Sequence, residues 1–127
     1  YLVDVGVESF YGKVYLIGEY ESYADIEKVI TLAKATSGVR EVVPHLMQIR
    51  KDPTCTSATN LALQGNVKVA LLNEGEVWGT NIHVHAVQCH IILAGVIETR
   101  LEELRAIEVV ERFIDVRSTT SYMRVLH

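Results

Sequence analysis

The sequence predicts an α+β fold made of two tandem copies of one small unit with the order α-β-β-α-β. The first observation is an internal repeat, because a constant shift of 77 residues places Val14 on Ile91 and Gly18 on Gly95 without a gap. The second is that each copy passes from strand-like alternation to helical spacing. The third is the composition, 49% apolar and 22% charged residues, which is typical of a globular protein that buries a core.

The first copy begins with a predicted β-hairpin. Apolar and polar residues alternate in residues 5–8 and 14–16, as expected for half-buried strands. Gly12 suits the second position of a two-residue turn, where the backbone needs positive φ. This turn places Val7 opposite Leu16, so one face of the hairpin is apolar.

A helix and a third strand complete the first copy. Apolar residues recur at helical spacing within residues 23–37, and Gly38 provides a stop. The strand predicted for residues 39–49 contains Pro44, which favours a sheet edge or a bulge.

The second copy contains the full set of elements. Its opening helix covers residues 57–73, with Ser57 or Thr59 as the N-cap. The other predicted elements are strands at 82–87 and 90–97, a helix at 100–113 and a strand at 116–126.

We therefore divide the chain into a first unit at residues 1–50, a linker at 51–56 and a second unit at 57–127. The first unit is β-β-α-β and lacks its opening helix in this sequence. An apolar face is then left open, and we expect residues before Tyr1, a neighbouring unit or another chain to cover it.

Charge and motifs exclude several functions. The net charge of −4 disfavours nucleic-acid binding and gives no general attraction to anionic lipid. The sequence contains no Gly-rich phosphate loop, nucleophile-elbow Ser or HExxH motif. We therefore expect neither an enzyme nor a cofactor.

The repeated pattern V-x-V-x-x-x-x-G-x-V-x-L-x-G, followed by a helix and G-V-x-x-V, resembles the BON domain of bacterial cell-envelope proteins. The first copy carries the pattern at Val5, Val7, Gly12, Val14, Leu16, Gly18 and residues 38–42. The second copy departs from it at Cys89, Asp115 and Thr119, where Gly, Gly and Val are expected.

The resemblance implies a small sheet with helices on one face and a non-catalytic role. It also implies a periplasmic location, with outer-membrane anchoring through an upstream lipidated segment. The expected function is binding of phospholipid membrane or an envelope protein, in support of envelope integrity and the stress response. The alternative is a soluble regulatory or scaffold module that binds a protein or a small ligand, and homo-oligomers fit either function.

Aromatic residues suggest where a membrane or partner is contacted. Phe10 and Tyr11 occupy one hairpin tip with Lys13 beside them, and Trp78 lies in a helix-to-strand loop. Aromatic side chains favour the bilayer interface. Packing within the core or loops is the alternative for each of them.

The two cysteines are candidates for a disulfide. If helix 57–73 runs antiparallel to strand 82–87, its start lies near the end of that strand, so Cys55 approaches Cys89. A bridge fits an oxidising compartment, whereas two free thiols are the alternative.

His83 and His85 point to the same side of a strand, which is the spacing for a shared metal ion. No third ligand is placed by spacing, so a polar outer face or an interdomain contact is the favoured interpretation. We also expect these histidines to gain charge together near pH ~6.

Overall fold

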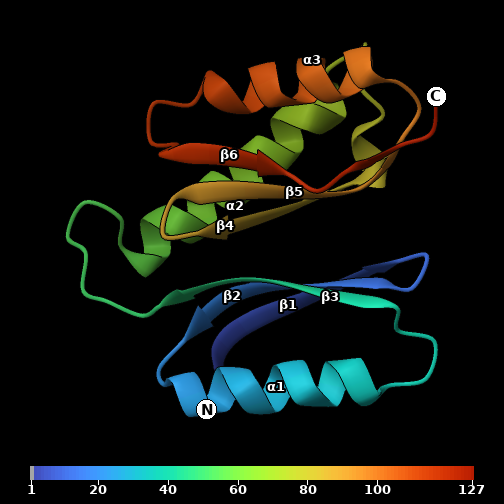
Figure 1. Ribbon diagram of the computed structural model, residues 1–127. Helices are drawn as coiled ribbons and strands as arrows, with labels where there is room; N and C mark the ends of the chain where they lie inside the picture. Colours follow the sequence, from blue (N-terminus) through green and yellow to red (C-terminus); the bar gives the residue numbers. More distant parts are fainter. Residues whose placement is uncertain (1) are drawn as a thin grey trace. The chain divides into compact units, whose positions relative to one another are not determined.

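The computed structural model describes the backbone of residues 2–127 and the side chains of residues 5–127 (Figure 1). The chain divides into two compact units, Tyr1–Lys51 and Asp52–His127. Each unit combines a small sheet with helices, so the predicted α+β fold with two related units is confirmed.

Unit 1 is a three-stranded sheet with one helix. Its elements are β1 (Leu2–Phe10), β2 (Lys13–Tyr20), α1 (Tyr23–Ala35) and β3 (Glu41–Gln48). The strand order is β1-β2-β3, with β1 antiparallel and β3 parallel to β2. Helix α1 packs mainly against β2 and β3 on one face of this sheet (Figure 1). Pro44 lies in the edge strand β3, as its position predicted.

The hairpin of unit 1 has the register that the sequence predicted, with Val7 opposite Leu16. Tyr11 and Gly12 both have positive φ, 55° and 82°, as a type I′ turn requires. A Cβ at Gly12 would lie 2.9 Å from the carbonyl oxygen of Gly38, so glycine is needed there for space as well as for conformation.

Unit 2 begins with a helix that has no counterpart within residues 2–51. Its elements are α2 (Ser57–Asn73), the short 3-10 helix Gly79–Asn81, β4 (Ile82–Val87), β5 (His90–Ile97), α3 (Arg100–Glu111), β6 (Ser118–Ser121) and β7 (Arg124–Val125). Strands β4 and β5 are antiparallel, whereas β6 and β7 both run parallel to β5. The single strand predicted for residues 116–126 is therefore two short strands.

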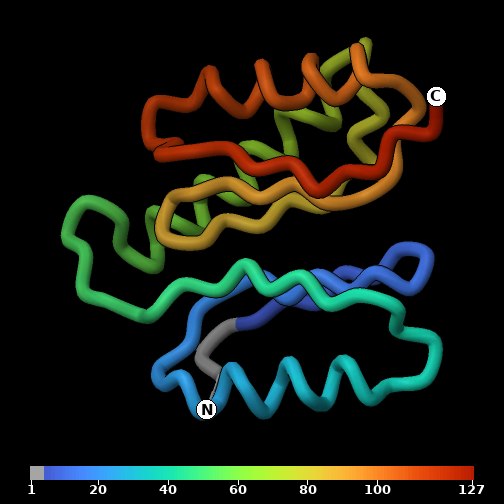
Figure 2. Tube along the Cα trace, in the orientation of Figure 1, coloured from blue at the N-terminus to red at the C-terminus, as the bar shows by residue number. Residues whose placement is uncertain are grey.

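Helices α2 and α3 lie on one face of this sheet and enclose the core of unit 2 (Figure 2). Leu63, Val67 and Leu71 of α2 recur at i, i+4 and i+8 and are at most 4% exposed. They pack with Ala106, Val109 and Val110 of α3 and with Ile82, Ile91 and Leu93 of the sheet.

The N-cap of α2 and the C-terminal ends of α1 and α3 differ from the prediction by a few residues. The cap of α2 is Thr56, whose side chain accepts a hydrogen bond from the Thr59 N–H at 3.2 Å, so neither Ser57 nor Thr59 is the cap. Helix α1 ends at Ala35 because Thr36 takes an extended backbone. Helix α3 ends at Glu111, and Asp115 has no left-handed conformation. In the described part of the chain, no helix is both long and apolar enough to span a bilayer.

Candidate functional site

The tip of the first hairpin exposes an aromatic side chain. Tyr11 is 61% exposed, and Phe10 beside it is half-buried. The carbonyl of Gly12 accepts hydrogen bonds from the N–H groups of Arg40 at 2.7 Å and Glu41 at 3.3 Å. Because these bonds tie the turn to the start of β3, Tyr11 is presented by a fixed backbone.

Lys13 contributes little free positive charge to this tip. Its Nζ lies 3.4 Å from Glu41 Oε2 and 5.7 Å from the centroid of the Tyr15 ring. The pKa of Lys13 is raised, first by the neighbouring Tyr15 phenol and then by the hydrogen bond and charge of Glu41. Lys13 is therefore paired with an acid, while the exposed Arg40 side chain lies beside Gly12 and adds one positive charge near the tip.

Trp78 is the second exposed aromatic candidate, and it belongs to unit 2. Its side chain is 64% exposed, at the rim of an open depression of about 470 Å³. The backbone N–H of Trp78 donates to Glu102 Oε2 at 2.7 Å, and the backbone N–H of Glu98 donates to Glu102 Oε1 at 2.9 Å. One carboxylate thus fixes the loop that carries the tryptophan.

The arginines near this loop are paired with acids. Arg105 Nε lies 2.8 Å from Glu76, and the same guanidinium lies 3.4 Å from Glu108. Arg112 lies 3.6 Å from Glu74. Among the described residues, Arg105 and Arg112 therefore form no basic patch for anionic headgroups. The structure groups Phe10, Tyr11 and Lys13 at one hairpin of unit 1, whereas Trp78 belongs to a loop of unit 2.

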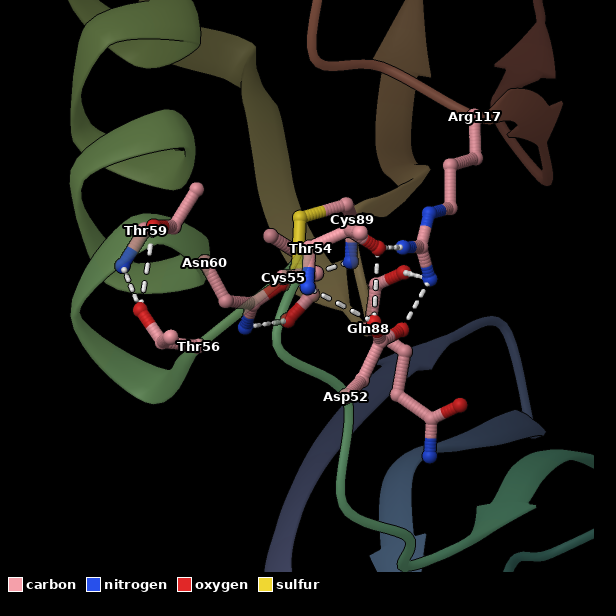
Figure 3. Close-up of a disulfide and its surroundings, with 10 residues drawn as sticks. Asp52, Thr54, Cys55, Thr56, Thr59, Asn60, Gln88, Cys89 and Arg117 are labelled. Carbon is pink, nitrogen blue, oxygen red and sulfur yellow. Dashed lines mark hydrogen bonds and ion pairs between the residues drawn. A yellow bond between two sulfur atoms is a disulfide. The ribbon is translucent and has the colours of Figure 1, made fainter.

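The second hairpin holds a disulfide where the first presents its tyrosine. Cys55 and Cys89 are bonded, with their Cα atoms 6.1 Å apart (Figure 3). Gln88 and Cys89 have φ of 50° and 63°, so this turn has the same hand as the first although it contains no glycine. The Cys89 N–H donates to Asn60 Oδ1 at 2.9 Å. Both turn residues are buried, so the tip is closed.

An ion pair fixes the same end of unit 2. Arg117 Nη1 lies 2.5 Å from Asp52 Oδ2, and its Nη2 donates to the Thr54 hydroxyl (Figure 3). Arg117 lowers the pKa of Asp52 well below its usual range, with help from Thr54, and the pKa of Arg117 is raised in return. Asp52, Thr54 and Cys55 from the predicted linker therefore bind to unit 2. The ion pair was missed because its partners are 65 residues apart.

A polar stripe on α2 caps the outer edge of β4. The Asn60 amide donates to the Ala86 carbonyl at 2.7 Å, and the Ala86 N–H donates to Gln64 Oε1 at 2.8 Å. Lys68 Nζ donates to the carbonyls of Gly79 at 2.8 Å and Ile82 at 2.5 Å, and burial lowers its pKa. These residues were not predicted. The signal for them was the i, i+4, i+8 spacing of the polar side chains beside the apolar stripe.

The histidines lie on the edge strand β4, with His83 exposed and His85 partly exposed. Among the side chains of residues 5–127, no three His, Cys, Asp or Glu side chains converge as a metal site would require. His90 Nδ1 is 2.6 Å from the Ser118 hydroxyl. The His83 and His85 pair therefore supplies two potential ligands on an open strand.

These features define a class of small tandem α+β module whose exposed aromatic residues lie on hairpin and loop surfaces. The sequence profile of the BON domain matches residues 3–49 and 59–126, and the chain belongs to the BON-domain family. The family supports a non-catalytic, envelope-associated module.

Two similar solved structures come from Chlamydia trachomatis: CdsD, a structural protein of the type III secretion system, and the C-terminal domain of CdsD. Both are 12% identical to this chain with a TM-score of 0.48. The first alignment covers 98% of this chain and 87% of CdsD, and the second covers 99% and 92%. Structural similarity at this level supports no argument about function. The sequence matches no curated protein.

Proposed function

We propose that this protein is a periplasmic module of the bacterial envelope that contacts the phospholipid surface through the tip of its first hairpin. The observation that carries the proposal is the 61% exposure of Tyr11 on a turn whose backbone is fixed to β3. A rigid, exposed phenol flanked by Phe10 suits the bilayer interface, because its ring prefers the headgroup boundary while its hydroxyl stays hydrated.

Charge plays a small part in the proposed contact. Lys13 is paired with Glu41, Arg40 beside the turn adds a single positive charge, and the chain carries a net charge of −4. We therefore expect vesicle binding that differs little between neutral and anionic lipid and that tolerates salt.

The Cys55–Cys89 bridge supports the periplasmic assignment. Disulfides persist in oxidising compartments, and this one is enclosed within unit 2. It also leaves the second hairpin tip closed, so the first hairpin is the better candidate for insertion.

The test is co-sedimentation with phosphatidylcholine vesicles and with vesicles containing phosphatidylglycerol. Tyr11→Asn removes the ring but creates an Asn-Gly turn, which is the preferred type I′ sequence, so the fold is retained. We expect this variant to lose most of the bound fraction, and Phe10→Ala to lose part of it. Tyr23→Ser, at a tyrosine that is 71% exposed on α1, is the matched control and should bind normally. Equal binding by Tyr11→Asn and the unsubstituted protein would overturn the proposal.

Docking of an envelope protein at Trp78 is the second candidate. The open depression lined by Leu72, Val77 and Trp78 favours it, because an exposed ring beside a hollow suits a protein side chain. Absence of vesicle binding, together with a Trp78-dependent complex in cross-linked envelope extracts, would favour this function over the first.

A further inference from the structure

Helix α2 is apolar on two opposite sides. Its inner side packs into the core of unit 2, as described above. On the side that points away from this core, Leu61 is 70% exposed, Val69 is 56% exposed and Leu72 is 48% exposed. At 3.6 residues per turn these three positions fall on one stripe of the helix. The helix therefore presents a second aliphatic surface that unit 2 itself does not bury.

The outer stripe of α2 carries no charge. Ala58, Ala62 and Gly65 complete it, and all three are exposed. Lys68 is the one ionisable residue of the helix, and its Nζ is bound to two backbone carbonyls beside β4. The outward side of a surface helix ordinarily carries charged and polar residues. An uncharged aliphatic stripe in that place indicates a contact surface.

Gly65 lies in the middle of this stripe, where unit 2 does not require a glycine. A glycine inside a helix is less stable than an alanine because it loses more backbone entropy on folding. Gly65 has no positive φ, and a Cβ built on it meets no atom within 4 Å among the described residues. A glycine at a helix surface does allow a second helix to approach closely. We therefore read Gly65 as the point at which another helix crosses α2.

The stripe is symmetric about Gly65, which is the middle residue of the 17-residue helix. Leu61 and Val69 lie four residues on either side of it, and Ala58 and Leu72 lie seven residues on either side. A two-fold axis at Gly65 relates two antiparallel copies of α2. Leu61 of each copy then faces Val69 of the other. The large Leu72 faces the small Ala58 in the same way, so the stripe is complementary to itself.

We propose that the outer stripe of α2 binds the same stripe of a second copy of this chain, which gives an antiparallel homodimer with its two-fold axis at Gly65. Leu72 also lines the depression beside Trp78, so the apolar surface continues past the end of the helix. The pair buries roughly 1,000 Å² in total, which is the lower limit for a specific interface. We therefore expect a dissociation constant in the micromolar range. This inference does not depend on the proposed lipid contact of Tyr11.

A second copy fits the stripe better than a lipid surface or an unrelated helix. Helices that lie in the bilayer interface carry Lys or Arg beside large apolar side chains. The outer stripe of α2 is flanked instead by Asn66 and Asn73, and half of its six positions are Ala or Gly. An unrelated helix has no need of positions that match about a two-fold axis, whereas a copy of the same helix does.

The first test measures the dimer by sedimentation equilibrium between about 5 and 500 µM, with the native disulfide intact. Gly65→Lys places a long cation on the axis, and unit 2 has room for its Cβ, so the variant retains its fold. We expect it to raise the dissociation constant by about tenfold or more. Asn66→Lys is the matched control, because it adds the same charge at the next exposed position, off the stripe. This control should dimerise as the unsubstituted protein does.

The second test locates the axis by cross-linking. Cys55 and Cys89 are bonded to each other, so Gly65→Cys adds one free thiol to each copy. Two such thiols meet at the axis with their Cα atoms within about 7 Å, and mild oxidation should link the copies. Asn66→Cys should link far less. The proposal is overturned if the unsubstituted protein is a monomer at about 500 µM, if Gly65→Lys leaves the dimer intact, or if the two cysteine variants link equally. A Gly65→Lys variant that loses vesicle binding without any change of oligomeric state would also overturn it, because the stripe would then belong to lipid.

Discussion

The two units share a hairpin register and a parallel third strand, yet they differ in how each is closed. Unit 2 has α2 over its sheet, polar side chains along the edge of β4 and a disulfide at its hairpin tip. Unit 1 has one helix, an exposed Val7 and an exposed Tyr11 at the corresponding tip. Among the described residues, the same strand frame is thus closed by a helix and a disulfide in unit 2 and left open along β1 in unit 1.

Loss of the disulfide is expected to have the largest effect. The bridge closes a loop with a sequence separation of 34, which corresponds to about 4 kcal/mol of unit 2 stability in the chain-entropy view. We compare Cys55→Ala/Cys89→Ala with Cys55→Ala/Cys89→Gly by denaturant unfolding, followed through Trp78, the single tryptophan.

The double variant with Cys89→Gly should have a free energy of unfolding about 1 kcal/mol higher than the one with Cys89→Ala. The reason is that φ at Cys89 is 63°, a region that only glycine adopts without cost. Equal stabilities for the two double variants would contradict the view that the disulfide holds an unfavourable turn in place.

Equivalent core positions should respond differently in the two units. Val109→Ala should lower the free energy of unfolding of unit 2 by about 2–3 kcal/mol, because apolar surface is no longer buried and a cavity is left. Leu32→Ala, at the counterpart in unit 1, should cost less than about 0.5 kcal/mol because the side chain is exposed. Chemical denaturation followed by NMR resolves each unit, and similar costs at the two sites would show that Leu32 is buried in solution.

The ion pair between Asp52 and Arg117 makes the stability of unit 2 depend on pH through the Asp52 carboxylate. The pKa of Asp52 is lowered in the folded state, so its stabilisation is complete above the unfolded pKa of about 3.9 and is lost as the pH falls towards the lower folded pKa. The stability difference between the unsubstituted protein and Asp52→Asn should be constant from pH ~5 to ~7 and shrink below pH ~4. A difference that does not change with pH would exclude Asp52 as the titrating group.

The smallest predicted effect is a gain in stability at Thr119. Its hydroxyl is buried and, among the described residues, has no hydrogen-bond partner, whereas unit 1 has Val42 at the equivalent position. Thr119→Val should stabilise unit 2 by about 0.5–1 kcal/mol in thermal or denaturant unfolding. A loss of stability would mean that the hydroxyl is satisfied in solution.

Local patterns in the sequence predicted much of the fold. Alternation and turn chemistry predicted the pairing of Val7 with Leu16, and helical spacing predicted the extent of α2, although its N-cap is Thr56 and not Ser57 or Thr59. These signals act between near neighbours, so one sequence is enough to find them. The repeat then related the two units, because the apolar positions of one reappear in the other.

Interactions between distant residues were not predictable in the same way. Nothing in the local sequence distinguishes Asp52 and Arg117 from ordinary surface charges, or Asn60 and Gln64 from solvated helix positions. Their partners depend on which strand edge α2 lies beside, which is a tertiary property. For Tyr11 the sequence left two alternatives, exposure at the hairpin tip or packing within the core or loops, because an aromatic residue is compatible with both.

The most direct test of the contrast between the closed and open copies is native-state amide hydrogen exchange at Ser9 and Ala86. The Ala86 N–H is bonded to Gln64 of α2, whereas the equivalent N–H of Ser9 faces outward from an uncovered edge. We predict that the Ser9 amide exchanges about a hundredfold or more faster than the Ala86 amide under the same conditions. Equal protection of the two amides would contradict the account, because it would mean that unit 1 is already closed.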